Sequence, residues 1–112
     1  MKIEILGDTA VATPAGRIDV GNAGQIQAAL WGALDDGAKQ LLLDLSDVSY
    51  VSSVGLAVCL KCGKRAQQDG GGLALCSLNE HVADVFEVSG IGKLFGIYPS
   101  RGDALVALGV TG

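Results

Sequence analysis

Two adjacent serines, Ser52 and Ser53, occupy the position in this chain that most favours chemistry. They follow an apolar run, Leu41 to Leu45, and directly precede a helical pattern, so a hydroxyl lies where a helix begins. The first backbone amides of a helix lack intrahelical partners, and the helix dipole is positive there. This position therefore favours a side-chain oxygen or an added anion. Ser53 either caps the helix or carries a phosphate, and the pattern alone leaves both interpretations open.

Three cysteines and one histidine are the candidate redox or metal-binding residues. Cys59 and Cys62 form a Cys-x-x-Cys motif, but they lie in the second and third turns of a predicted helix. A catalytic dithiol lies instead at a helix N-terminus, where the dipole favours the thiolate. A zinc site would also need Cys76 and His81, and Cys76 belongs to an apolar strand pattern. We expect buried thiols, a surface histidine, and neither a metal nor a cofactor.

Three aspartates, Asp19, Asp44 and Asp47, are the candidate acid–base groups. Catalytic carboxylates need a substrate cleft and a tuned environment, whereas aspartate between a strand and a helix is ordinary turn chemistry. The Gly-x-Ser-x-Gly pattern of a hydrolase nucleophile would need glycine at position 51, where the chain has Val51. We therefore predict that the protein is not an enzyme.

The elements that position these residues alternate between strands and helices after an initial hairpin. Strands are predicted at 2–6, 9–13, 41–45, 73–78 and 94–98. Helices are predicted at about 22–35, 54–68, 79–88 and 101–108. The pattern indicates one domain over residues 1–112 with an α/β fold. Its mixed sheet has four to five strands, is parallel at its centre, and is accompanied by about four helices.

The helix predicted after the serines must present an apolar face to the sheet. We expect Val54, Ala57 and Val58 on one side of this helix, with Leu56 alongside them. Residues 16–19 are expected to return the chain from the hairpin toward the first helix.

Composition limits the class of partner. The 112 residues carry a net charge of −4 and include no run rich in lysine and arginine, which argues against direct binding of nucleic acid. A lysine at position 2 interrupts any signal-like apolar start, and no apolar stretch approaches the roughly 20 residues of a membrane span. We expect a cytoplasmic protein without membrane insertion, whose partners are other proteins.

The segment from Asp44 to Leu56, DLSDVSYVSSVGL, resembles the STAS domain, the family of bacterial anti-sigma-factor antagonists. Residues 16–19 are similar to the family's early strand-to-helix segment, and residues 89–98 to its C-terminal pattern. The resemblance therefore covers nearly the whole chain and implies a STAS-like fold. Ser52 and Val54 stand where the family often has an acidic and a small residue.

The resemblance also implies a function in transcription regulation by partner switching. In the family, the serine or threonine at this helix start is phosphorylated by a GHKL-type serine kinase that is also an anti-sigma factor. The matching residue is Ser53. The unphosphorylated domain is then expected to bind this partner and free a sigma factor, until phosphorylation blocks binding and a serine phosphatase restores it. The implied partner-binding residues are Asp19, Ser52, Ser53, Val54, Gly55 and Leu56.

A second hypothesis gives the same helix end another partner. Some stand-alone STAS domains are accessory subunits of lipid-transport ABC systems, and they bind the ATPase without a phosphorylation cycle. The sequence is compatible with both hypotheses, which differ in the protein that would be recovered with this chain.

Overall fold

The computed structural model describes residues 1–110. Residues 111 and 112, at the end of the predicted domain 1–112, lie outside the described part. In chain order the elements are β1 (Lys2–Leu6), β2 (Thr9–Thr13), β3 (Gly16–Ile18), α1 (Ala23–Asp35), β4 (Gln40–Asp44), β5 (Val48–Val51), α2 (Ser53–Gln68), β6 (Gly72–Cys76), α3 (Glu80–Ser89), the short 3-10 helix η1 (Ile91–Leu94), β7 (Gly96–Tyr98) and α4 (Arg101–Ala107).

The main sheet has five strands in the order β1-β2-β4-β6-β7. β1 and β2 pair antiparallel as the predicted hairpin, and every other neighbouring pair in this sheet is parallel. The predicted fold class, a mixed sheet that is parallel at its centre with four helices, is confirmed. The strands that follow the hairpin alternate with crossover helices, as parallel pairing requires.

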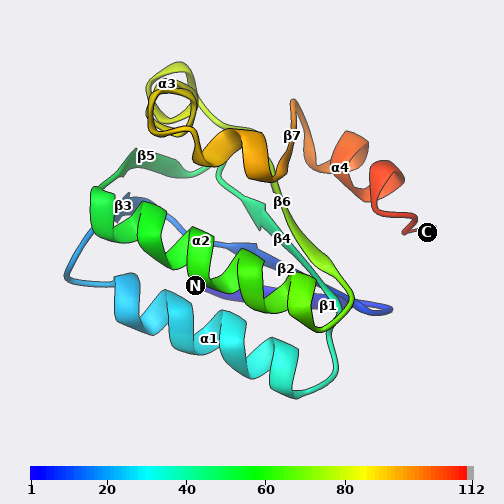
Figure 1. The fold of residues 1–112 in the computed structure, drawn as a ribbon. Helices are drawn as coiled ribbons and strands as arrows, with labels where there is room; N and C mark the ends of the chain where they lie inside the picture. Colours follow the sequence, from blue (N-terminus) through cyan, green and yellow to red (C-terminus); the bar gives the residue numbers. More distant parts are fainter. Residues whose placement is uncertain (111–112) are drawn as a thin grey trace.

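The central strand β4 explains the uninterrupted leucine run. Leu41 and Leu43 belong to the core on the face covered by α1 and α2, whereas Leu42 belongs to the core on the opposite face, beneath α4 (Figure 1). All three leucines are at most 1 % exposed. A strand that is buried on both faces needs apolar residues at successive positions, whereas a strand with one exposed face alternates apolar and polar residues.

Asp44 is the buried exception at the end of β4. Its carboxylate accepts a hydrogen bond from the Ser46 amide at 3.1 Å and another from the Arg101 guanidinium of α4 at 2.9 Å. Arg101 also donates to Glu4 at 3.4 Å and to Thr13 at 3.0 Å. Burial raises the pKa of Asp44, but these hydrogen bonds outweigh it and hold the pKa below its usual value. Asp44 therefore fastens α4 to the sheet.

A second, two-stranded parallel sheet pairs β3 with β5, and the sequence did not predict it. Residues 16–19 were expected only to return the chain toward the first helix, and no strand was predicted between the strand at 41–45 and the helix at 54–68. Both segments are three or four residues long, so they show too little alternation to be recognised locally. The Ser52 amide donates to the Ile18 carbonyl at 2.8 Å, and this contact fixes where the chain enters α2.

The last predicted strand, 94–98, is too long. Leu94 lies in η1, and only Gly96–Tyr98 pair with β6. Phe95 between them is buried, with its ring packed on α2 at Gly63, where a side chain would collide with it. Packing of Phe95 against the helix therefore takes this residue out of the strand.

Candidate functional site at the start of helix α2

Ser52, and not Ser53, caps α2. The Ser52 hydroxyl accepts a hydrogen bond from the Gly55 amide at 3.2 Å, and the Ser52 carbonyl accepts one from the Leu56 amide at 2.9 Å. Ser52 has extended backbone angles, as an N-cap residue does, and Ser53 is the first helical residue. The interpretation of Ser53 as the capping residue is therefore wrong. The Ser53 hydroxyl does not cap the helix and is exposed.

Ser53 and Val54 are exposed at the tip of the helix. Within residues 1–110, their backbone amides donate to no other protein group, as expected for the first turn of a helix. The prediction that Val54, Ala57 and Val58 share one side of the helix is wrong, because Val54 and Ala57 are exposed whereas Val58 is buried. The register follows from Leu56, Cys59 and Cys62, which pack on the sheet.

Gly55 brings the start of α2 close to β3. A Cβ atom at Gly55 would lie 2.8 Å from Ile18 Cγ2 and 3.0 Å from Val51 Cγ1. Together with the hydrogen bond from the Ser52 amide to Ile18, this close approach holds the first turn of α2 rigidly on the small sheet. Gly55 and Leu56, both predicted to contact a partner, are buried and support the exposed residues beside them.

Asp19 lies directly after β3 and is half-buried. Its carboxylate accepts a hydrogen bond from the Gly21 amide at 3.0 Å and lies 3.8 Å from the Arg17 guanidinium. Because Ile18 is bonded to Ser52, Asp19 is placed beside the start of α2, next to Ser52 and Ser53. The structure therefore brings Asp19 to the same end of the molecule as the serines.

A hollow of about 470 Å³ opens beside Ser53, between the start of α2, the end of β5 and the exposed side of α3. The sequence did not predict it. Its lining residues from β5 and α2 are Tyr50, Val51, Ser53 and Leu56, and those from α3 are His81, Asp84, Val85, Val88 and Ser89. The walls are mainly apolar, with one imidazole and one carboxylate.

Exposed valines surround the same end of the molecule. Val20 is 82 % exposed, Val88 is 88 % exposed and Val54 is 43 % exposed. Val20 follows β3, Val54 follows Ser53, and Val88 lines the hollow. Apolar residues in otherwise polar surface segments are the signal that could have identified this surface from the sequence.

The thiols take no part in this site. Burial raises the pKa of Cys59 to about 12 and that of Cys62 to about 11, so both are protonated and unreactive at neutral pH. Cys76 is also buried, whereas His81 is exposed, as expected. Among the described residues, no group of three or more histidine, cysteine or acidic side chains is placed to hold a metal ion.

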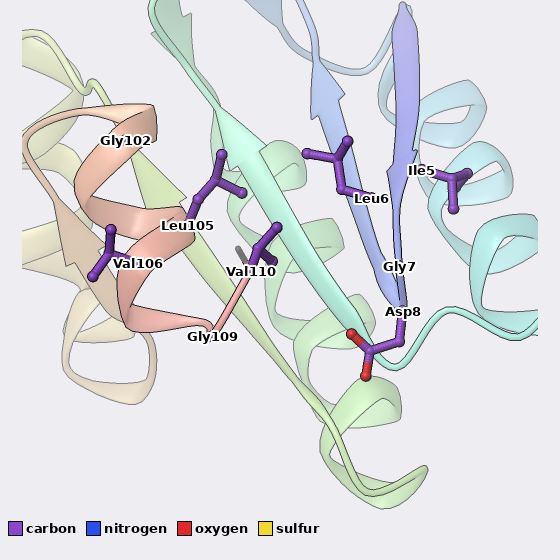
Figure 2. Close-up of a pocket in the computed structure, with 9 residues that line it drawn as sticks. All are labelled: Ile5, Leu6, Gly7, Asp8, Gly102, Leu105, Val106, Gly109 and Val110. Carbon is purple, nitrogen blue, oxygen red and sulfur yellow. The ribbon is translucent and has the colours of Figure 1, made fainter. Parts of the chain in front are cut away.

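A larger pocket, of about 660 Å³, lies on the opposite face of the sheet, between α4 and the β1–β2 hairpin. Figure 2 shows Leu6, Leu105 and Val110 around this space, with Asp8 at the hairpin turn. Among the described residues of the lining, Asp8 alone has a charged side chain. None of the residues predicted to do chemistry contributes to this pocket, so it is separate from the end of the molecule that carries Ser53.

The described residues thus combine a five-stranded mixed sheet with an exposed serine at the first position of α2. The chain belongs to the STAS domain family, whose model matches residues 1–104.

Two curated relatives share this domain. The chain is 39 % identical over 97 residues to the putative anti-sigma factor antagonist BtrV of Bordetella bronchiseptica. This alignment covers 87 % of this chain and 84 % of the relative. It is 35 % identical over 83 residues to the anti-sigma-B factor antagonist of Bacillus subtilis, covering 74 % and 75 %. These relatives are named as anti-sigma factor antagonists.

Solved structures support the same fold. A putative anti-sigma factor antagonist from Thermotoga maritima superposes with a TM-score of 0.90 and 26 % identity, over 96 % of this chain and 92 % of that one. The Bacillus cell fate determinant SpoIIAA in its phosphorylated form has a TM-score of 0.75 and 21 % identity, over 95 % and 96 %, which shows the shared fold. No helix within residues 1–110 is both long and apolar enough to cross a membrane.

Proposed function

We propose that this chain is an anti-sigma-factor antagonist that is switched off by phosphorylation of Ser53. The partner is an anti-sigma factor that is also a GHKL-type serine kinase, and a serine phosphatase reverses the modification. The observation that carries the proposal is the exposed Ser53 hydroxyl, which is free of the capping role and stands beside an apolar hollow. Curated relatives that are named as anti-sigma factor antagonists support the antagonist role.

The local structure makes Ser53 a suitable acceptor. A phosphate adds about −1.5 to −2 charges. At Ser53 these charges would lie at the positive end of α2, near two amides without protein acceptors in the described chain. The capping bond at Ser52 and the contact of Gly55 with Ile18 do not involve the Ser53 side chain. Phosphorylation therefore changes the surface and leaves the fold intact.

The same charge opposes docking. A partner that covers Val54 and the hollow must remove water from the phosphate, and any carboxylate it brings near is repelled. One pair of like charges at 4 Å costs between about 1 and 4 kcal/mol for effective dielectric constants of 80 to 20. Because every 1.4 kcal/mol is about a tenfold change in affinity, local electrostatics is sufficient for an on/off switch.

The test combines intact mass with a binding titration. Incubation with the cognate kinase and ATP is expected to add one phosphate to wild type and none to Ser53→Ala, whereas Ser49→Ala, which removes an exposed serine from the neighbouring strand β5, is modified like wild type. Unmodified wild type and Ser53→Ala are expected to bind the partner equally, and the phosphorylated protein at least about tenfold more weakly. Equal affinities for all forms, or recovery of an ABC ATPase as the bound protein, would contradict the proposal.

A further inference from the structure

Among the described residues that line the hollow beside Ser53, one side chain is basic, the imidazole of His81. We propose that His81 is a positioning residue that holds the phosphoryl group of phosphorylated Ser53 inside the hollow. This inference rests on the proposed phosphorylation of Ser53. It adds the position of the phosphate, which lies over the hollow and contacts α3. His81 is exposed and does not belong to the buried core.

Ser53 and His81 form parts of two walls of the same hollow. Ser53 is the first residue of α2, and His81 is the second residue of α3, which lines the hollow with one side from His81 to Ser89. The start of α3 is fixed because Asn79 caps it at the Val82 amide, at 2.8 Å, and donates to the Val48 carbonyl of β5, at 3.0 Å. The positive end of α2 favours an anion at Ser53.

The imidazole is oriented by an aromatic neighbour. The ring of His81 stacks on Tyr50, with centroids 6.1 Å apart and planes inclined by 19°. The guanidinium carbon of Arg17 lies 4.2 Å from the centre of the Tyr50 ring. Tyr50 also lines the hollow, so the stack places the imidazole at the edge of the space that a phosphate on Ser53 would enter.

Three other charged residues near the imidazole would attract or repel the phosphate. Asp84 of α3 lines the hollow and repels an anion, and Glu80 precedes His81 in the first turn of α3. From β3, Arg17 contributes a cation that is already paired with Asp19 at 3.8 Å. Within the hollow, His81 is thus the side chain able to donate a hydrogen bond to the phosphate as a cation, opposed by Asp84.

Filling the hollow has a consequence for the partner. An apolar side chain that docks between Tyr50, Val85 and Val88 would meet a hydrated, hydrogen-bonded phosphate in the phosphorylated protein. The switch then acts by occupying the docking surface as well as by charge repulsion at the tip of α2.

The experiment installs phosphoserine at position 53 by genetic-code expansion, so that no kinase is needed. The second ionisation of the phosphate, which lies at about pH 6 for a free phosphoserine, is followed by phosphorus NMR as a function of pH. An imidazolium at hydrogen-bonding distance favours the dianion, and a carboxylate disfavours it. His81→Gln is therefore expected to move the ionisation upward by about half a pH unit, and Asp84→Asn to move it downward. A structural role for His81 alone would not produce these opposite shifts.

The chain has one histidine, so its proton NMR signals are unambiguous. The imidazole signals of His81 are expected to differ between the phosphorylated and the unmodified protein, because the coupling between two sites is reciprocal. Identical phosphate ionisation in wild type and His81→Gln would overturn the proposal for His81. Partner affinity that is unaffected by phosphoserine would instead overturn the proposed switch, and the NMR result would still decide the contact with His81.

Discussion

The assignment of the cap to Ser52 predicts that alanine at position 52 lowers the stability of the domain, whereas alanine at position 53 leaves it nearly unchanged. Ser52→Ala removes the acceptor of the Gly55 amide and leaves that amide without its capping partner. Loss of a cap costs about 0.5–2 kcal/mol, and the bond here is 3.2 Å long in a half-exposed residue, so we expect about 1 kcal/mol. Ser53→Ala removes a solvent-facing hydroxyl and should change stability by less than about 0.5 kcal/mol.

Thermal unfolding followed by far-UV circular dichroism measures the difference. For 112 residues at about 2.1 cal/mol/K each, 1 kcal/mol corresponds to a decrease in Tm of about 4 °C. Ser52→Asp is the matched control, because a carboxylate also accepts at the cap and interacts favourably with the helix dipole, and it should retain most of the wild-type Tm. A lower Tm for Ser53→Ala with an unchanged Tm for Ser52→Ala would refute the assignment.

Two further predictions concern the core. Arg101→Met should lower the free energy of unfolding by about 2 kcal/mol at pH 7, because Asp44 loses a charged partner. The pKa of Asp44 is lowered in the folded protein, so the stability that ionised Asp44 contributes is complete above about pH 4 and is lost as the pH falls through the folded pKa. The free energies of unfolding of wild type and Arg101→Met, measured by urea titration, should therefore converge below about pH 4. Gly63→Ala should lower the free energy of unfolding by about 1–2 kcal/mol, because the added methyl group collides with the Phe95 ring. Gly32→Ala is the control: its methyl group meets no atom within 4 Å, and it should stabilise the helix slightly. A Gly63→Ala variant that is more stable than wild type would contradict the packing of Phe95 on α2.

The features that could be predicted from the sequence are those with a pattern of apolar and polar residues that extends over about five residues or more. The leucine run specified a central strand buried on both faces, and the hairpin was readable from its alternation and its glycine turn. The pairing of β3 with β5 was missed because it joins segments about 30 positions apart, each too short to carry a periodic signal. Such pairing is decided by tertiary contacts.

The choice between Ser52 and Ser53 shows the same limit at the site. Both are small hydroxyl residues with nearly equal capping ability, and the sequence gives no local reason to prefer one. The register is set by the bond from the Ser52 amide to Ile18 and by the space left for Gly55. The exposure of Val54 follows from this register, and the family resemblance could indicate Ser53 without explaining why its hydroxyl is free.

The separation of roles between the two serines has a consequence for any modification of this surface. If one residue both capped α2 and accepted phosphate, each phosphorylation would break the cap and cost about 1 kcal/mol of stability. With the cap on Ser52, a change at Ser53 leaves the first turn held by its bond to Gly55 and by the contact with Ile18. The whole interaction free energy of an added charge is then available to alter binding. A switch at Ser53 therefore requires no second conformation of the domain, and phosphorylated and unmodified protein should have the same backbone fold.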